Sequence, residues 1–332
     1  MATYNLNHSG LDKLLDQSVS NPTEHMIWQA LLGADLLPKG HGTIGVETES
    51  VGGFYTVPAG DNFFLDTGLS NAMTLSSQGG VVIAAGDGGN SILDQGPGGD
   101  TLIGGAGADK LQVTQGDNLL IGGGGFFNTI GGGTGHDFMT GGATHFDGWN
   151  SGDGGGHGQG NGGGHWDDHE HGDDHGHGHG HGDDHTGQTF PSDTLIGGSG
   201  NDTFMVAHGD NWIYAGTGAD TIYAGDGSDK IFGSTIAGAT NAMDTIYLGT
   251  GNTSIEGGAA GSASIYAGMH GNDTITGSAA GQTLDLYSDQ SSHNVISTNL
   301  SGGITTITFK DHQSLTLENV TIHFSNGTVS KV

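Results

Sequence analysis

The chain has 332 residues, of which 69 are glycine and only 33% are apolar, and it contains no cysteine. Its 36 acidic residues, against six lysines and no arginine, give a formal net charge of −30. Because nucleic acids and anionic membranes are bound by basic side chains, this charge argues against both partners and favours cations. The absence of cysteine excludes disulfides, thiolate-bound zinc and thiol catalysis. No apolar run reaches the roughly 18 residues of a membrane span.

Residues 1 to about 40 are predicted to be helical. Leu11, Leu14 and Leu15 have helical spacing, and "NPTEHMIWQALLG" (21–33) places proline in a first turn and glycine at the end. The N-terminus lacks the basic start and apolar core of a signal peptide, so we expect the protein to stay inside the cell or to leave by another route. We expect residues 1–56 to form a short helical cap over the open end of the next segment.

A nine-residue period begins near residue 57 and places a large apolar residue two positions after a polar one. Between residues 192 and 232 the polar positions are Asp193, Asp202, Asn211, Asp220 and Asp229, and the apolar ones are Leu195, Phe204, Ile213, Ile222 and Ile231. Such a period indicates a repeat array. It divides into two blocks, 57–144 and 188–285, and residues 99–121 align without gaps to 192–214.

The best copies are "GGAGADKLQ" (104–112), "GGSGNDTFM" (197–205), "AGTGADTIY" (215–223) and "AGDGSDKIF" (224–232). They match G-G-x-G-x-D-x-U-x, so the chain resembles the RTX, or haemolysin-type calcium-binding, family. Calcium takes six to eight oxygen ligands, which glycine-rich turns supply as carbonyls and aspartate as a carboxylate. The resemblance implies an all-β fold, a parallel β-roll or β-solenoid. Two nonapeptides would make each coil, with ions between stacked loops.

Alternation of the repeats between two edges predicts which loops share an edge. One edge would carry the loops that end at Asn90, Asp109, Asn128, Asp202 and Asp220. The other would carry those that end at Asn62, Asp100, Asn118, Asp137, Asp193, Asn211 and Asp229. We expect calcium mainly along the first edge, because its loops are richer in glycine. For the Asp193, Asn211 and Asp229 loops, the alternative is a hydrogen-bonded asparagine ladder without metal.

The best predicted calcium site lies between loops 197–202 and 215–220, and a second lies between loops 85–90 and 104–109. The predicted calcium-binding residues are Asn90, Gly104, Gly105, Gly107, Asp109, Gly197, Gly198, Gly200, Asp202, Gly216, Gly218, Asp220, Gly225, Gly227, Asp229, Asp193, Asp100 and Asp137.

Residues 145–187 are almost all glycine, histidine, aspartate and asparagine, and we expect a disordered insertion because so little apolar surface can be buried. Imidazole binds zinc, copper and nickel, so the insertion is a candidate for weak transition-metal capture. The alternative is a solvated spacer. The candidate ligands are His165, His169, His171, His175, His177, His179, His181 and His185.

Residues 286–332 alternate apolar and polar side chains, for example at Ile307, Phe309, Leu315 and Leu317, which predicts antiparallel strands that form a C-terminal β cap. This tail is similar in character to the uncleaved C-terminal signals by which RTX proteins leave the cell through type I secretion.

The motifs of metalloproteases, α/β-hydrolases and Walker-type nucleotidases are missing, and about 56 residues before the repeats are too few for a catalytic domain. We therefore expect a non-catalytic, calcium-binding structural or adhesive protein, secreted or on the cell surface, that folds on extracellular calcium. It would self-assemble into a matrix, surface layer or fibre, with further copies or a matrix polysaccharide as partners. Two alternatives stay open: a transition-metal-binding protein acting through the insertion, and an enzyme with a site on a solenoid face.

Overall fold

The computed structural model describes part of the chain. The described residues are 2–38, 42–57, 62–77, 79–124, 127–142, 192–233, 244–257, 264–267, 271–277, 284–288 and 290–332. Contacts divide the chain into one compact unit, residues 1–144 with 190–332, and a second unit, residues 145–189. All described residues belong to the first unit. The predicted insertion, 145–187, and its histidines lie outside the described residues.

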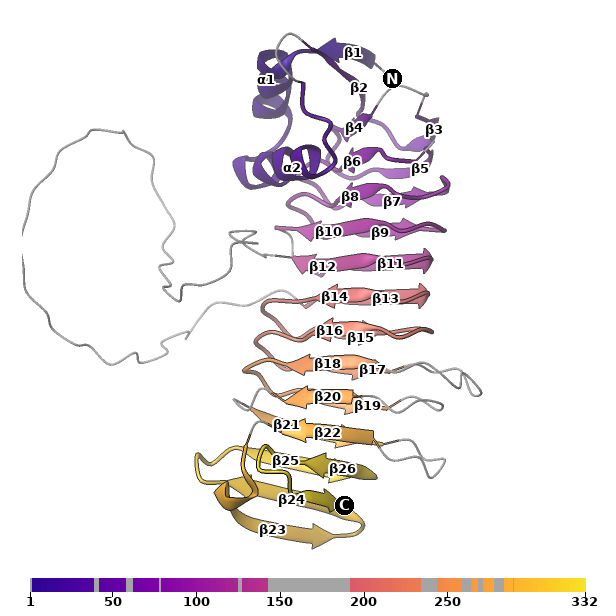
Figure 1. The fold of residues 1–332 in the computed structure, drawn as a ribbon. Coiled ribbons are helices and arrows are strands. Elements are labelled where there is room, and N and C mark those ends of the chain that lie inside the picture. The colour runs from indigo at the N-terminus through magenta and orange to yellow at the C-terminus, as the bar shows by residue number, and fades with distance from the viewer. Residues whose placement is uncertain are drawn as a thin grey trace, which may run out of the picture. The chain divides into compact units, whose positions relative to one another are not determined.

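The first unit is a roll of two large β-sheets (Figure 1). From β2 to β22, successive strands alternate between the sheets, and each strand pairs in parallel with the strand one coil away. The predicted all-β parallel β-roll is confirmed.

Within the described residues, sheet A has fourteen strands. In spatial order they are β1 (Ala2–Leu6), β2 (Ile44–Glu49), β4 (Phe63–Asp66), β6 (Val82–Ala84), β8 (Thr101–Ile103), β10 (Leu119–Gly123), β12 (Phe138–Gly142), β14 (Thr203–Met205), β16 (Thr221–Tyr223), β18 (Thr245–Leu248), β20 (Ser264–Ala267), β22 (Leu284–Ser288), β26 (Val320–His323) and β27 (Val329–Lys331).

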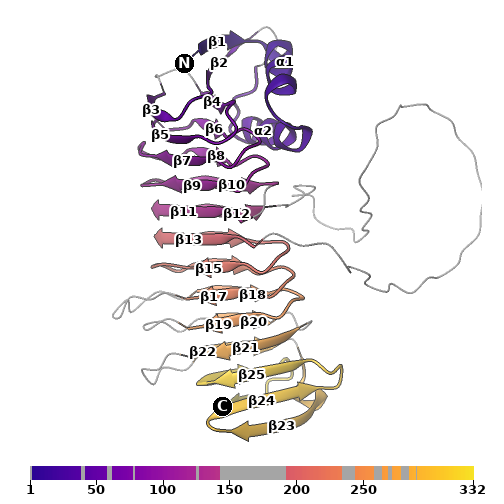
Figure 2. The same cartoon turned by 180° about the vertical axis from the view of Figure 1, so that it is seen from behind.

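Sheet B has thirteen strands in the part of the chain that the structure describes. Figure 2 shows this sheet from the other side. In spatial order they are β3 (Gly53–Thr56), β5 (Ala72–Ser76), β7 (Ser91–Asp94), β9 (Lys110–Val113), β11 (Thr129–Thr134), β13 (Thr194–Ser199), β15 (Trp212–Tyr214), β17 (Lys230–Phe232), β19 (Ser254–Glu256), β21 (Asn272–Thr276), β25 (Ser314–Glu318), β24 (Ile304–Phe309) and β23 (Val295–Ser301).

The core between the sheets is filled by the apolar residue of each nonapeptide. Ile213, Ile222 and Ile231 are all at most 1% exposed, and their neighbours in the strands face outward. Because side chains alternate along a strand, a three-residue strand supplies one inward side chain. The period of nine therefore yields one core residue from each strand.

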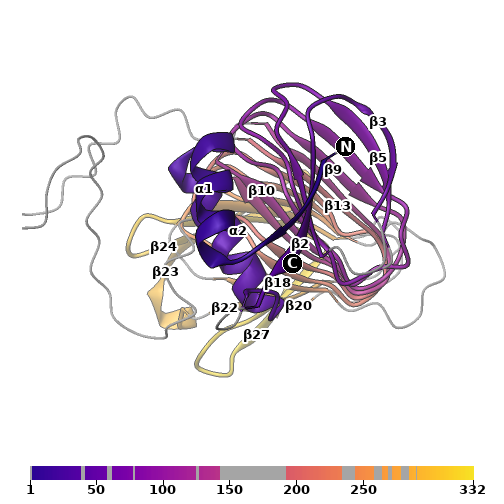
Figure 3. The same cartoon turned by 90° about the horizontal axis from the view of Figure 1, so that it is seen from above.

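The two N-terminal helices, α1 (His8–Ser18) and α2 (Asn21–Gly33), cover the outer face of sheet A. Leu15, Ile27 and Leu31 pack in one cluster with Phe63 and Val82, which point away from the roll interior. The predicted cap over the open end is wrong, because the helices lie beside the coils (Figure 3). Apolar residues on both faces of β4 and β6 create the surface that they cover.

The roll also begins earlier than the predicted boundary at residue 57. Strands β2 and β3 already supply one member of each sheet, and β1 extends sheet A by antiparallel pairing with β2. None of the described helices is both long enough and apolar enough to cross a membrane.

The C-terminal part ends the roll in antiparallel strands, as its alternation predicts. Strands β25 and β26 still pair in parallel with β21 and β22, and then β24, β23 and β27 pair in antiparallel fashion. A short 3-10 helix, η1 (Ser292–Asn294), precedes β23.

Candidate metal sites at the edges of the roll

A polar residue ends the turns of the repeat region, immediately before the next strand. Turns from sheet A to sheet B form the A-to-B edge, whose polar residues are Asn71, Asn90, Asp109, Asn128, Asp193, Asn211 and Asp229. Turns from sheet B to sheet A form the B-to-A edge, whose polar residues are Asp100, Asn118, Asp137, Asp202, Asp220 and Asp244.

This arrangement corrects the predicted edges in the second block. Asp202 and Asp220 lie on the B-to-A edge with Asp137, whereas Asp193 and Asp229 lie on the opposite edge. The reason is that β12 belongs to sheet A and the next strand along the chain, β13, belongs to sheet B. The alternation between the sheets therefore continues across the insertion as across a single turn, and the repeats after it keep their edges. The predicted pairing of loop 197–202 with loop 215–220 is nevertheless found.

The polar residues of each edge form a hydrogen-bonded ladder. The backbone N–H of each donates to the side-chain Oδ1 of the next one along, at 2.7–3.1 Å, from Asn71 to Asp229 and from Asp100 to Asp244. A ladder without metal was predicted as an alternative for the Asp193, Asn211 and Asp229 loops only. The hydrogen-bonded ladder itself extends along both edges and uses one oxygen of every ladder aspartate.

Asn90, Asn118 and Asn211 direct Nδ2 to carbonyls of their own turns. Nδ2 of Asn118 and of Asn211 also donates to Oδ1 of Asp137 and of Asp229, both at 2.9 Å. Nδ2 of Asn90 donates to the carbonyls of Gly86 at 3.1 Å and Gly88 at 2.7 Å. Nδ2 of Asn211 donates likewise to the carbonyls of His208 and Gly209. Asn118 follows the same pattern. At these positions an amide already fills the place at which carbonyl oxygens converge.

Aspartate at the same position leaves a buried oxygen without a partner. Because Oδ1 accepts the ladder bond in both residue types, Oδ2 takes the place of the asparagine Nδ2 and cannot donate. The ladder aspartates whose Oδ2 is buried and lacks a hydrogen bond are Asp109, Asp137, Asp202, Asp220 and Asp229, all at most 2% exposed. A buried acceptor facing other acceptors is costly unless a cation or a proton joins them.

Glycine at the start of the turn lets oxygens from two coils approach one another. A Cβ atom on Gly197 would lie 2.6 Å from Oδ2 of Asp202 and 2.2 Å from the carbonyl oxygen of Ala215 in the next coil. Gly132 and Gly104 have the same surroundings with Asp137 and Asp109. Among the predicted glycines, Gly105, Gly198, Gly200, Gly216, Gly218, Gly225 and Gly227 have φ between 62° and 146°, which favours glycine. Gly107 lacks positive φ, but its Cβ would lie 2.2 Å from Gly88.

Burial makes these carboxylates reluctant to ionise. It raises the pKa of Asp220 to about 8, helped by the charges of Asp244 and Asp202. Burial likewise raises the pKa of Asp109 and Asp229 to about 7 and that of Asp202 to about 6. Negative charge in such places is stabilised by a bound cation.

Asp100, another predicted ligand, takes part in a different arrangement. The Ser77 hydroxyl lies 2.7 Å from Oδ2 of Asp100 and 3.1 Å from Oδ2 of Asp94, and all three residues are buried. One hydroxyl proton cannot serve both carboxylates. Burial, and then the contact with Asp100, raises the pKa of Asp94 to about 6. Sequence reasoning missed Asp94. It could have been found because an acidic residue stands where the strand is expected to end in a small or apolar one.

Carbonyls must supply most of the ligands of any ion at the edges. Within the described ranges, no three histidine, aspartate or glutamate side chains lie together in a way that could hold a metal ion. A site with one or two carboxylates and several carbonyls suits a hard cation with many oxygen ligands, such as calcium.

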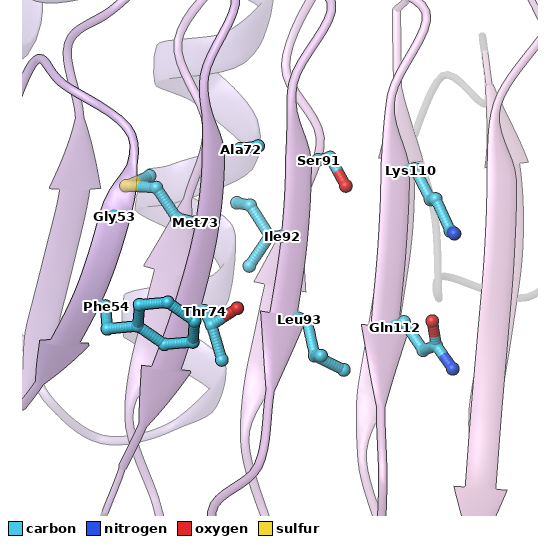
Figure 4. A pocket seen from close by; sticks show the side chains of 10 residues that line it. All are labelled: Gly53, Phe54, Ala72, Met73, Thr74, Ser91, Ile92, Leu93, Lys110 and Gln112. Carbon is cyan, nitrogen blue, oxygen red and sulfur yellow. The ribbon is translucent and has the colours of Figure 1, made fainter.

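The outer face of sheet B carries a groove of about 360 Å³ (Figure 4). Phe54, Thr74, Leu93, Lys110 and Gln112 are among the residues that line it, and none of the lining residues is acidic. The groove therefore offers no carboxylate pair of the kind used in polysaccharide hydrolysis.

A family model of the RTX calcium-binding nonapeptide repeat matches residues 94–126, 192–205 and 209–235, in four copies. The predicted resemblance is confirmed, and the chain carries calcium-binding RTX repeats. No curated protein and no solved structure matches the chain.

Proposed function

We propose, from the RTX calcium-binding repeats that this chain carries, that it is a secreted, non-catalytic structural or adhesive protein whose roll folds on extracellular calcium. The observation that supports this most directly is the row of buried aspartate oxygens without a partner on the B-to-A edge, at Asp137, Asp202 and Asp220. Three such residues on consecutive coils place like charges next to one another.

The residues that would hold calcium are these three aspartates, with Asp109 and Asp229 on the other edge. The carbonyls of the glycine-rich turns complete the oxygen set. A bound ion would supply positive charge next to the buried Oδ2 atoms. Asn90, Asn118 and Asn211 would separate the sites, because their amides donate to the same kind of carbonyl.

Calcium concentration then controls folding. Inside a cell calcium is scarce, and a chain with a net charge of −30 repels itself. Outside, millimolar calcium fills sites with dissociation constants of about 10⁻⁴–10⁻³ M, typical of extracellular modules. Because only the folded roll brings the turns together, binding stabilises the fold by mass action.

Circular dichroism of the full chain at neutral pH tests this proposal. We expect a β-rich spectrum in millimolar calcium and its loss in chelator, with recovery when calcium is restored. Magnesium should not replace calcium, because it prefers a smaller octahedral site and keeps its waters. An equally β-rich spectrum in chelator, with an unchanged unfolding temperature, would refute calcium-dependent folding.

Export through a type I system belongs to the same proposal and is tested separately. A reporter placed ahead of residues 286–332 should reach the medium in cells with such a system. The same reporter followed by residues 1–40 should be retained. Equal retention of both fusions would rule out export by this route.

Self-assembly is supported by the edge strand β23. It is seven residues long and uncharged, it is the last strand of sheet B, and Ile296 and Leu300 are 54% and 71% exposed. An uncharged, exposed edge strand pairs readily with another chain. Electron microscopy after calcium addition should show polymers, which Leu300→Lys should shorten or abolish. Single particles alone would contradict assembly.

A further inference from the structure

Among the described residues of the first coils, three acidic side chains are buried outside the residues that match the RTX repeat: Glu47, Glu49 and Asp66. Two of them end neighbouring strands. Strands β2 and β4 are neighbours in sheet A (Figure 1). Glu49 ends β2 and Asp66 ends β4, and the parallel register sets these two residues opposite each other. Phe64 points into the core, whereas Phe63 and Leu65 pack beneath the helices. Alternation along the strand therefore turns Asp66 into the roll, and Glu49 faces the same way.

The carboxylate of Asp66 is only half satisfied. Its Oδ1 accepts hydrogen bonds from the Gly68 backbone N–H at 2.8 Å and from Nδ2 of Asn71 at 2.6 Å. Its Oδ2 is buried and has no partner, and the residue is 0% exposed. Glu49 is 8% exposed. Two carboxylates side by side in the interior, one with an unused oxygen, are costly unless a cation or a proton lies between them.

The turn after β4 is organised around this carboxylate. Asn90 directs its amide to the carbonyls of its own turn, but Asn71 directs its amide to Asp66. Leu65 pairs with Ala84, so the position of Asp66 corresponds to Ala85 in the next coil. An acid in place of a small residue is a specific feature of the first coils.

We propose that Asp66 and Glu49 form a divalent-cation site of the calcium class at the start of the roll. It differs from the edge sites because both carboxylates come from the ends of adjacent strands. The donors are oxygen atoms only, which favours a hard cation. A cation here joins β2 to β4, next to the strands on which the helices pack. The site does not require that the ladder aspartates bind calcium.

Counting the calcium ions bound to the full chain tests the site. Native mass spectrometry at saturating calcium should show one ion fewer in Asp66→Asn and in Glu49→Gln than in the unaltered chain. Asp16→Asn, at an exposed position of α1, is the matched control and should keep the full number. Asp220→Asn is the reference for the ladder and should also lose ions.

The outcomes separate this inference from the proposed function. If Asp220→Asn loses ions and Asp66→Asn keeps them all, the two carboxyls share a proton and the inference is wrong. If the unaltered chain binds no calcium, the proposed function fails as well. If neither Asp66→Asn nor Glu49→Gln folds, terbium emission sensitised by tyrosine is the second test of the site. It should fall in Tyr55→Phe, because the charges of Glu49 and Asp66 act on Tyr55, and unchanged emission overturns the site.

Discussion

Asparagine and aspartate occupy equivalent positions along the edges, but their side chains need opposite partners: the asparagine Nδ2 needs an acceptor, and the aspartate Oδ2 needs a donor or a cation. Asn90 completes the hydrogen bonds of its Nδ2 within its own turn, whereas Asp220 buries an acceptor that no group in the described residues satisfies. The difference is one atom, an NH₂ group in place of an oxygen. The ladder is therefore self-sufficient at asparagine, whereas each ladder aspartate with an unpartnered Oδ2 needs a cation or a proton there.

Replacing Asp220 by asparagine should therefore stabilise the calcium-free roll. The new amide can donate to the carbonyls of its turn and remove an unsatisfied acceptor that costs about 1–3 kcal/mol. Thermal unfolding in chelator should show a higher midpoint than for the unaltered chain, and calcium should raise it less. Asp220→Ala, which loses the ladder bond as well, is the matched control and should be destabilised. A lower midpoint for Asp220→Asn in chelator would contradict this role of the ladder.

The raised pKa values predict how stability without calcium depends on pH. A carboxyl whose pKa is higher in the folded state binds its proton more tightly there, so protonation favours folding. Stability in chelator should be greatest below the ordinary carboxyl range and fall as the pH rises through about 6 to 8, the values of Asp202, Asp109 and Asp220. Chemical unfolding in chelator at several pH values measures this dependence of stability on pH.

In calcium this fall should disappear, and binding near pH 7 should release protons, because the ion competes with them for the same oxygens. Proton release is measured as the dependence of the binding enthalpy on the buffer. Stability in chelator that rises from pH 5 to pH 8 would be inconsistent with the burial of these aspartates.

Turns and helices decide how the coils pack, and the first glycine of a turn leaves no room for a side chain. A Cβ on Gly197 would meet two oxygens within 2.6 Å, whereas nothing lies within 4 Å of a Cβ on Gly124. Gly197→Ala should lower the free energy of unfolding in calcium by about 1–3 kcal/mol, the usual cost of overpacking. Gly124→Ala should leave it nearly unchanged. Similar values for both variants in denaturant titrations would show that the turns tolerate more movement than this packing implies.

The helices should contribute stability through one face only. Leu31 is fully buried against the outer face of sheet A, and its neighbour Leu32 is 61% exposed. Leu31→Ala should cost about 2–5 kcal/mol of unfolding free energy. Leu32→Ala should cost little. If instead the two variants cost the same, the helices do not pack on sheet A through the face that carries Leu31.

Sequence periodicity predicts the strands well because each nonapeptide specifies its own turn, strand and inward side chain. It fails where contacts between distant segments decide. The helices cover sheet A because "FFLD" and "VVIAA" are apolar on both faces, a pattern that does not identify its partner. The edge of Asp202 depends on how many turns the insertion occupies, and local spacing carries no information on that number.

At the scale of the whole molecule, the net charge of −30 and the aspartate ladders have the same consequence, which is electrostatic repulsion between stacked coils. The sheets supply an apolar core that every coil shares, so the coils can stack only if the edges tolerate their own charge. Acids at successive coils of the B-to-A edge oppose stacking until cations bind. Under this account, the positions of the ladder asparagines and of Glu49 and Asp66 determine where along the roll cations bind.

The most direct test is to locate the ions in crystals of the full chain grown in calcium, by their anomalous scattering. We expect ions beside Oδ2 of Asp137, Asp202 and Asp220 and of Asp109 and Asp229. We expect none in the turns that end at Asn90, Asn118 and Asn211. Calcium at the asparagine turns, or a folded roll whose aspartate turns hold no ion, would contradict the dependence of the ladders on a cation.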